Sequence, residues 1–404
     1  MIRERFDFEK EYGLVLEGGG AKGAYQIGVW KAFLECGVKI KGIAGVSVGA
    51  LNGALICMGD YEKAVDIWKN ISYSRIINVD DNQMEKLMNL RFKELSLQEV
   101  RKQGKSFLTS GGLDVTPLRQ LMDETVDEQK IRESNIEFIM GTFNLNNMKE
   151  IEIDAKEAED GSLKDYLLAS ASFPLFKNEK LNGVKYLDGG IANNVPIDML
   201  INRGYTDIIV VRIFGIGIEK KVKIPEEVRV TYIAPKTNLC NVLEFNRKKA
   251  IRNITLGYYD ALRILKALAG NDYYIESNRI ESEYLASLAN MDEEQMKDLF
   301  MQHKHEGNVY AVSLRKLTQE LYPRVANMLK LAKNWDYSDL YYGILEYCAK
   351  KLRISRYRVY TESEFCKLLM DKMENTELTV NEVSKKPDLI MSLGKAIVKN
   401  IVIT

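Results

Sequence analysis

The chain contains 404 residues, of which 46% are hydrophobic and 28% are charged. This length exceeds one typical domain, so we expect either one large globular domain with an appendage or roughly two to three units. Lysine and arginine together number 57, as do aspartate and glutamate, so the net charge gives no basis for nucleic-acid binding. Five scattered cysteines lack C-x-x-C spacing, which predicts reduced thiols and a cytoplasmic protein.

Two segments bear on membrane targeting. The opening sequence MIRERFDFEK is charged throughout, which predicts no signal peptide. Residues 42–59 form an uncharged stretch of 18 residues, which just reaches the length of a transmembrane helix. That stretch contains five glycines, a serine and an asparagine, so we expect a buried core segment and no transmembrane helix. A peripheral contact with a membrane stays open.

The first part of the chain predicts alternating strands and helices. Apolar runs, helical spacing and an N-capping aspartate (Asp60) indicate strands at Gly13–Leu16 and Val38–Ala44 and helices at 22–36, Val48–Cys57 and Tyr61–Trp68. A β-α-β-α order of this kind predicts a parallel sheet with helices on both faces.

The later part of the chain changes character. Further strands are expected at Ile136–Phe143, Glu150–Asp154, Val184–Leu187 and Asp207–Ile213, the last of them almost continuously apolar. After about residue 235, amphipathic helical patterns prevail, at Leu239–Ala269, Asp292–Phe300, Leu314–Lys333 and Ser338–Lys351. We therefore expect a domain at 1–270 and a helical domain at 271–404.

The string Gly45-Val46-Ser47-Val48-Gly49 lies between an expected strand and an expected helix. This is the setting of a nucleophile elbow, a turn so sharp that only small residues fit two positions before and after the serine. The N-terminus of the following helix favours an alkoxide developing on Ser47. The sequence thus predicts Ser47 as a nucleophile, with Gly45 and Gly49 as supporting residues.

The string Gly18-Gly19-Gly20-Ala21-Lys22-Gly23 follows the first expected strand. In a parallel sheet, the loops after adjacent strands meet at the same edge, so this row should face Ser47. Backbone N–H groups of Gly18, Gly19 and Gly20 can then hold an oxyanion. We expect Lys22 to brace the loop, although it could also add positive charge there.

The same glycines also spell the dinucleotide-binding pattern G-x-G-x-x-G. That pattern requires an acidic residue at the end of the second strand to hold a ribose hydroxyl. Here the second strand runs directly into Gly45-Val46-Ser47, and no acid stands at its end. The nucleotide interpretation is therefore disfavoured, and the chain has no P-loop string.

A serine nucleophile needs a base. The chain has two histidines, His303 and His305, which lie in a polar stretch far from the other motifs. Asp188 is the better candidate, because it ends a short expected strand and precedes Gly189 and Gly190, where the backbone can bend. Partial desolvation would raise the pKa of this carboxyl and improve it as a base.

Together the three motifs, at 18–23, 45–49 and 188–190, resemble the signature of the patatin-like phospholipases, lipid acyl hydrolases that use a Ser-Asp dyad. The flanking strings Ala169-Ser-Ala-Ser-Phe-Pro174 and Asn193-Asn194-x-Pro196 are also similar to that family, and the resemblance covers roughly residues 13–215. It implies a three-layer α/β/α fold with a mostly parallel central sheet, followed here by a helical C-terminal region. It also implies Ser47 as nucleophile, Asp188 as base, the Gly18–Gly20 backbone as oxyanion hole, and a phospholipid or other acyl lipid as substrate.

No metal or organic cofactor is implied by the resemblance, and the sequence predicts no oligomeric state. Two alternatives stay open: a catalytically silent fold serving as a binding or scaffold protein, and a carboxylesterase acting on non-lipid esters. A triad that recruits His303 or His305 is a third. Residues 72–110 combine apolar and charged side chains, so they form either an interfacial lid or a helix packed on its own domain.

Overall fold

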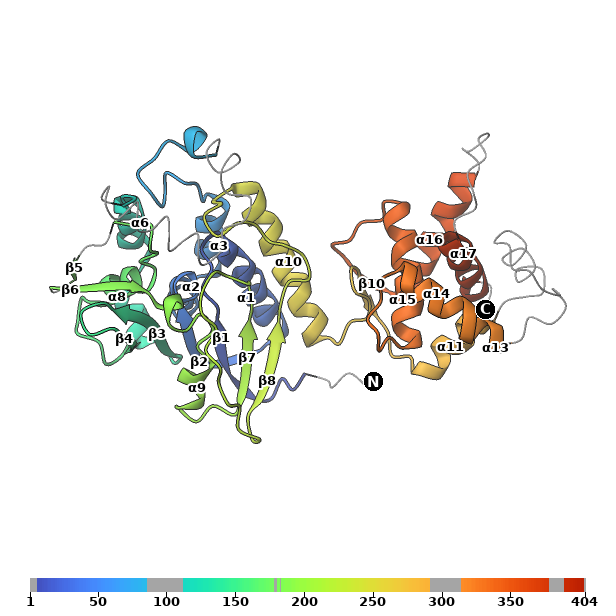
Figure 1. Cartoon of the computed structure of the whole chain (residues 1–404), viewed down its shortest axis with the longest axis horizontal. Coiled ribbons are helices and arrows are strands. Elements are labelled where there is room, and N and C mark those ends of the chain that lie inside the picture. The colour runs from blue at the N-terminus through green and yellow to red at the C-terminus, as the bar shows by residue number, and fades with distance from the viewer. Residues whose placement is uncertain are drawn as a thin grey trace. The chain divides into compact units, whose positions relative to one another are not determined.

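The computed structural model describes residues 6–85, 112–177, 180–181, 183–290, 314–377 and 389–402. The chain divides into two compact units, Asp7–Ala261 and one made mainly of Leu262–Thr404 (Figure 1). The division falls within helix α10 (Arg247–Leu265), a few residues before the boundary expected at residue 270.

The first unit alternates strands and helices in most of its length. Its elements are β1 (Glu11–Leu16), η1 (Gly20–Gly23), α1 (Ala24–Cys36), β2 (Lys39–Val46), α2 (Val48–Met58), α3 (Tyr61–Lys69), α6 (Thr116–Thr125), α7 (Glu128–Glu133), β3 (Glu137–Asn144), β4 (Lys149–Asp154), α8 (Leu163–Ser170), β5 (Lys180–Leu181), β6 (Val184–Asp188), η2 (Gly189–Ile191), α9 (Ile197–Ile201), β7 (Asp207–Val211) and β8 (Arg229–Ile233). The strands and helices expected before residue 213 are present with ends shifted by a few residues, and Asp60 caps α3 by accepting from the Lys63 N–H.

Within the described residues, the strands of the first unit form one mixed sheet in the order β5-β6-β3-β2-β1-β7-β8, with β4 paired to β3. Strands β1, β2, β3, β7 and β8 are parallel to one another, whereas β4 and β6 run antiparallel to β3. The expectation of a mostly parallel sheet is therefore confirmed. Carboxyl ends of the parallel strands share one edge, and this edge carries the loops that follow β1 and β2.

Helices lie on both faces of this sheet. Helix α2 packs on one face, where a Cβ added to Gly53 would meet Phe138 and Ile43. Helix α9 covers the opposite face, where Met199 and Leu200 join Val15, Ala44 and Val210 in one buried cluster. Neighbouring residues such as Ile43 and Ala44 face opposite sides because side chains alternate along a strand. This arrangement is an α/β fold with helical layers around a central sheet.

The second unit is mainly helical, as expected. It contains β9 (Tyr274–Glu276), α11 (Glu281–Ala289), α13 (Leu314–Lys316), the π-helical turn η4 (Leu317–Leu321), α14 (Tyr322–Met328), α15 (Tyr337–Lys351), β10 (Val359–Thr361), α16 (Glu362–Glu377) and α17 (Leu389–Val402). Its core is rich in buried tyrosines, including Tyr322, Tyr341 and Tyr360. The helix expected at Asp292–Phe300 lies outside the described residues.

One expected helix is wrong at its start. The pattern at Leu239–Ala269 predicted a continuous helix, but α10 begins only at Arg247. Residues before it form a loop in which Val242, Leu243 and Phe245 are buried. Their apolar spacing mimics an amphipathic helix, yet it serves to line a cavity, described below.

Candidate active site

Ser47 is the single residue that connects β2, which ends at Val46, to α2, which begins at Val48. Its backbone has φ 55° and ψ −128°, a conformation that non-glycine residues rarely adopt. A Cβ added at Gly45 would lie 2.5 Å from the Gly49 carbonyl oxygen, and one added at Gly49 would lie 2.1 Å from the Leu16 carbonyl oxygen. Both positions therefore require glycine, and the turn has the geometry expected of a nucleophile elbow.

Pairing of β2 and β6 with strand β3 brings Asp188 close to Ser47. Strand β2 runs parallel to β3 and ends with Val46 opposite Gly141. Strand β6 runs antiparallel to β3 on the same side and ends with Asp188 opposite Thr142, the next residue. Strands β2 and β6 thus run toward each other along β3, and their carboxyl ends meet. This register places Asp188 next to Ser47, although 141 residues separate them in the chain.

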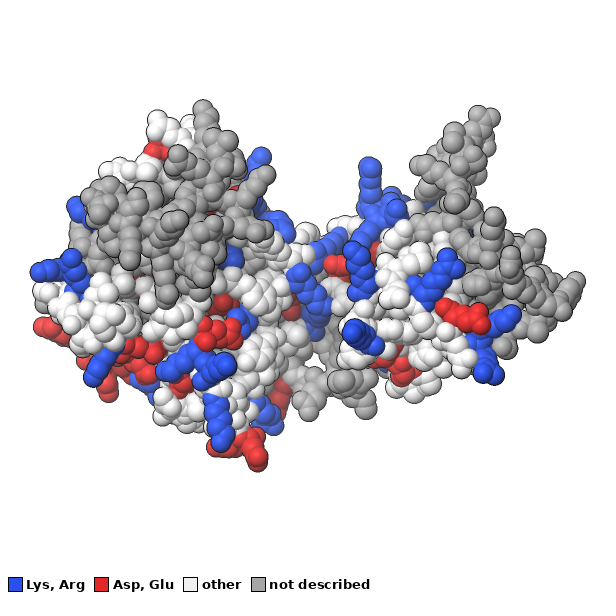
Figure 2. Space-filling model, viewed as in Figure 1, with Lys and Arg blue, Asp and Glu red and all other residues white. Residues whose placement is uncertain are grey.

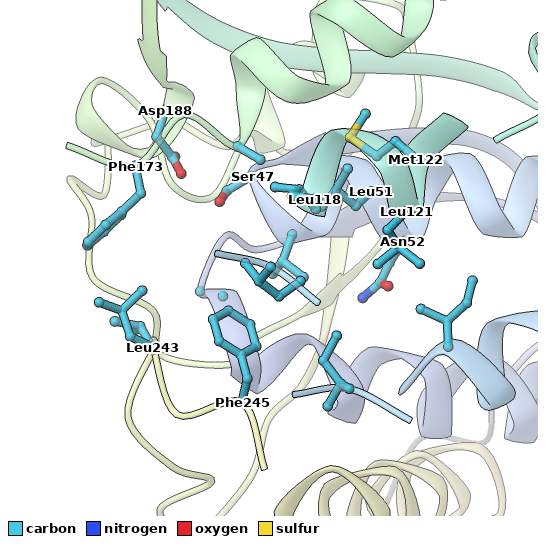
Figure 3. Close-up of a pocket in the computed structure, with 18 of the residues that line it drawn as sticks. Ser47, Leu51, Asn52, Leu118, Leu121, Met122, Phe173, Asp188, Leu243 and Phe245 are labelled. Carbon is cyan, nitrogen blue, oxygen red and sulfur yellow. The ribbon is translucent and has the colours of Figure 1, made fainter. Parts of the chain in front are cut away.

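The side chains of Asp188 and Ser47 face each other. The Asp188 carboxylate accepts from the Gly190 N–H at 2.8 Å, and the Ser47 hydroxyl is the second hydrogen-bonding group that lowers its pKa. Figure 3 shows the two side-chain oxygens facing each other at one end of a cavity. Burial raises the pKa of Asp188 from 3.8 to about 6, against the two hydrogen bonds, which lower it. A carboxyl with this pKa is a better general base near neutral pH than an exposed aspartate.

The glycine row lies beside Ser47 and Asp188, but its glycines differ in whether they bond within the protein or line the cavity. The Gly18 N–H donates to the Asn194 carbonyl at 3.3 Å, so it is engaged within the protein. Gly19 and Gly20 line the cavity together with Ser47 and Asp188. Gly20 has φ 55°, and a Cβ there would lie 2.1 Å from the Val242 carbonyl oxygen. The oxyanion hole stays a prediction, for which Gly19 and Gly20 are better placed than Gly18.

The cavity extends from this polar end into apolar surroundings (Figure 3). Its wall comes from α2, α3, α6, the segment after α8 and the loop before α10. The apolar lining includes Leu51, Leu55, Ile67, Trp68, Ile71, Ile76, Leu118, Leu121, Met122, Val126, Ala171, Phe173, Phe176, Ile216, Val242, Leu243 and Phe245. A site of this kind suits a long hydrocarbon group with a polar reactive end.

Comparison with known families agrees with this arrangement. Residues 14–201 match the model of the patatin-like phospholipase family. This part of the chain is therefore similar to the patatin-like phospholipases.

Curated relatives share only part of their length with this chain. Neuropathy target esterase sws of Drosophila melanogaster is 28% identical over 202 residues, which cover 49% of this chain and 12% of that protein. The Drosophila persimilis protein of the same name is 60% identical over 45 residues, or 11% of this chain and 3% of that protein. The chain thus spans a small fraction of the length of these relatives.

Two solved structures are similar at low scores. The crystal structure of VipD from Legionella pneumophila gives a TM-score of 0.39 at 14% identity, covering 97% of this chain and 91% of that chain. The type III effector protein ExoU gives 0.33 at 14% identity, covering 95% of this chain and 77% of that chain.

Lys22 of the patatin-like domain braces a neighbouring loop. Its ammonium group donates to the Phe214 carbonyl, in the segment after β7. Burial lowers the pKa of Lys22. This contact favours the bracing interpretation of Lys22 over a charge directed at the substrate. Gly23 and Gly189 are also tightly placed, since added Cβ atoms would lie 2.4 Å from Val48 Cγ2 and 2.5 Å from the Gly141 carbonyl oxygen.

Ser170 is a site residue to which the sequence assigned no role. Its hydroxyl donates to the Gly141 carbonyl at 2.6 Å and accepts from the Ser47 N–H at 3.0 Å. It is fully buried, at the end of α8. Ser170 therefore links the nucleophile elbow to β3 at the junction where β2 and β6 meet. It belongs to the quoted string 169–174, which was the signal that could have drawn attention to it.

Asn194 and Glu17 are two further buried polar residues. The Asn194 amide donates to the Gly18 carbonyl at 3.1 Å, so Asn194 and Gly18 bond each other twice. The Glu17 carboxylate accepts from the backbone N–H groups of Ile213, Phe214 and Gly215 at 2.6, 3.0 and 3.0 Å. Glu17 also pairs with Arg212 at 3.0 Å. These contacts hold the glycine row against the segment that follows β7.

Several expectations fall outside what the structure describes. His303 and His305 lie outside the described residues, as does most of the segment 72–110 considered as a lid. Within the residues that are described, no cluster of His, Cys, Asp or Glu could hold a metal ion. Across that same part of the chain, the helices are too short or too polar to cross a membrane.

Proposed function

We propose that the protein is a serine acyl hydrolase that cleaves ester bonds of phospholipids or related acyl lipids through a Ser47–Asp188 dyad. The observation that carries the proposal is that the Ser47 hydroxyl faces the buried Asp188 carboxylate at the polar end of an apolar cavity. The patatin-like domain supports the same class of reaction.

In the first step, the Asp188 carboxylate accepts the Ser47 proton as the hydroxyl oxygen attacks the ester carbonyl carbon. The backbone N–H groups of Gly19 and Gly20 donate to the oxyanion of the tetrahedral intermediate. The bond to the leaving alcohol then breaks, and Asp188 returns the proton to that alcohol. An acyl group remains on Ser47.

In the second step, water attacks the acyl carbon while Asp188 accepts a proton from it. The bond to Ser47 breaks, the serine oxygen recovers the proton, and a fatty acid leaves. The cavity beside the dyad would hold the acyl chain, because apolar side chains from several parts of the domain line it.

The direct test is hydrolysis of an ester by the wild type and by Ser47→Ala and Asp188→Ala variants. Both variants should lose turnover by at least about 10³-fold, the usual range for losing a nucleophile or its base. Near wild-type turnover in either variant would remove that residue from the mechanism. Ser172→Ala is a matched control, because the Ser172 hydroxyl donates within its own helix end, to the Leu168 carbonyl at 2.8 Å.

A fluorophosphonate probe distinguishes an enzyme from a silent scaffold. The proposed enzyme is labelled in the wild type and not in Ser47→Ala, whereas a scaffold is labelled in neither. Comparing fatty acids released from phospholipids with hydrolysis of short, water-soluble esters then distinguishes a lipid hydrolase from a general carboxylesterase. The apolar cavity favours the lipid substrate.

A further inference from the structure

The connection between β7 and β8 contacts two segments of the candidate active site, the glycine row (18–23) and the turn that follows Asp188. We call its first part, Arg212–Lys220, the strap. At one end, Glu17 accepts from three strap N–H groups and Lys22 donates to the Phe214 carbonyl. At the other end, the Ile218 N–H donates to the Gly190 carbonyl at 2.8 Å, and the Ile218 carbonyl accepts from the Asn194 N–H at 2.7 Å. The strap is thus tied to the glycine row and to the Asp188 loop.

Apolar side chains alternate along the strap. Ile216 lines the cavity. Phe214 and Ile218, two residues before and after it, are 52% and 39% exposed. Both belong to the few large apolar side chains that the described residues expose to this degree. Their backbones are fixed to the segments that carry Gly19, Gly20, Asp188 and Asn194, which line the cavity.

The backbone at Phe214 indicates that this exposure has a function. Phe214 has φ 50°, a left-handed conformation that is unfavourable for a bulky side chain. Such strain persists when surrounding contacts over-determine the backbone, and it is concentrated at functional sites. Here the bonds from Glu17 and Lys22 hold the conformation, while the aromatic ring gains little burial from it.

We infer that the strap is the surface by which this protein docks on a lipid bilayer, with Phe214 and Ile218 entering the interface beside the cavity mouth. The inference rests on the proposed function, because a lipid substrate must pass from a bilayer into the cavity. Aromatic and aliphatic side chains that surround a polar opening suit the boundary between headgroups and acyl chains. Lys221 and Lys223, which follow the strap and are exposed, suit anionic headgroups.

Vesicle binding of the full chain tests the inference. Binding is measured by co-sedimentation with phosphatidylcholine vesicles, with and without phosphatidylglycerol, in a Ser47→Ala background that leaves the vesicles intact. Phe214→Asn should weaken binding by about tenfold, the loss expected for one aromatic side chain at an interface. Asparagine tolerates a left-handed backbone, so this variant should fold at least as stably as the wild type. Lys221→Gln and Lys223→Gln should each weaken binding by about fivefold, on phosphatidylglycerol vesicles alone.

Leu34→Asn is the matched control. Leu34 is 55% exposed, nearly the same as Phe214, but it lies near the end of α1, which leads toward the opposite edge of the sheet. We expect Leu34→Asn to bind vesicles as the wild type does. Vesicle binding that survives in Phe214→Asn, or that falls equally in Leu34→Asn, overturns the inference.

Hydrolysis of a short, water-soluble ester separates the inference from the proposed function. With Ser47 intact, Phe214→Asn should hydrolyse this ester at a rate within about twofold of the wild type, because the substitution leaves the cavity lining unchanged. Ester hydrolysis that does not depend on Ser47 refutes the proposed function, whatever the vesicles show. Ser47-dependent hydrolysis without vesicle binding refutes only the docking surface. A dimer that dissociates in Phe214→Asn, without vesicle binding, would assign the strap to a second copy of this chain.

Discussion

The two units each bury a carboxylate, and the two carboxylates have different surroundings. In the first unit, Asp188 faces the Ser47 hydroxyl and borders an open cavity. In the second, Glu346 accepts from three backbone N–H groups, those of Asn271, Asp272 and Tyr273, at 2.7, 2.9 and 2.9 Å. Burial raises the pKa of both groups. A shifted pKa alone therefore does not identify a catalytic group, and the partner of the carboxylate decides.

A second buried cluster in the C-terminal unit extends the comparison. Glu362 accepts from Arg279 and Tyr341 at 2.6 and 2.7 Å and from Tyr342 at 3.2 Å. These groups satisfy one another, and the cluster ties α16 and the segment before α11 to α15. In the first unit, by contrast, buried polar groups such as Ser170, Asn194 and Glu17 bind the backbone of loops that stand open to a cavity. The surface charges give no comparable distinction. On the face of the first unit that Figure 2 shows, Lys and Arg are interspersed with Asp and Glu.

The largest expected effect is that of Asp188→Asn. Turnover should fall by at least about 10³-fold, because an amide cannot accept the Ser47 proton. Stability should rise, by up to about 3 kcal/mol, because a fold that raises a carboxyl pKa from 3.8 to about 6 disfavours the charged form. Ester hydrolysis and denaturant unfolding at neutral pH measure the two quantities. If the variant were inactive and also much less stable, Asp188 would have a structural role like that of Glu346.

Glu346→Ala should behave in the opposite way. Its removal leaves three N–H groups between Gly270 and Tyr274 without their acceptor, at about 1–3 kcal/mol for each buried group left unsatisfied. We expect stability to fall by about 3 kcal/mol or more and hydrolysis of a soluble ester to change by less than about twofold below the unfolding transition. Glu374→Ala, at an exposed position of α16, is the control for the stability measurement. A large loss of turnover in folded Glu346→Ala would contradict this division of roles.

Ser170→Ala sharpens the comparison within the first unit. The substitution removes the link between the Ser47 N–H and the Gly141 carbonyl, so the elbow should lose its register with β3. We expect kcat to fall by about tenfold with KM nearly unchanged, since the apolar side chains that line the cavity are unchanged. Ser172→Ala, two residues away, should retain kcat within about twofold. Equal losses in both variants would show that the string 169–174 contributes general packing and no specific alignment.

The sequence predicted the parts of the site that depend on local geometry. Gly45 and Gly49 are required by a turn of five residues, and Asp188 is marked by the glycines that follow it, so these could be read from short strings. Ser170 could not, because its role depends on where β3 brings together two strand ends. The loop before α10 was mistaken for helix, because side chains that line a cavity on one side of a loop imitate helical spacing. The role of Ser170 depends on strand pairing between distant segments, and the loop before α10 depends on the wall of the cavity. Neither can be read from a short stretch of sequence.

The effect of pH best separates the role of Asp188 in catalysis from its role in stability. Turnover should fall as pH drops through about 6, by about tenfold at one pH unit below, because Asp188 takes up a proton and can no longer act as base. Stability should move the other way, since the folded chain binds this proton at about pH 6, whereas the unfolded chain binds it only near 3.8. The contribution of Asp188 to stability therefore improves as pH falls from about 6 to about 4.

The Asp188→Asn variant has no carboxyl to titrate at this position, so comparing it with the wild type isolates the contribution of Asp188 protonation to stability. Its stability advantage over the wild type should be largest near neutral pH and should shrink toward zero between about pH 6 and pH 4. Denaturant unfolding of both proteins across this range measures the difference, while ester hydrolysis by the wild type follows activity. An activity midpoint near pH 7 that disappears in a His303→Gln/His305→Gln variant would instead assign the base to an imidazole. A midpoint near 6 that is unchanged in that variant, paired with the shrinking stability difference, assigns both effects to the same buried carboxyl.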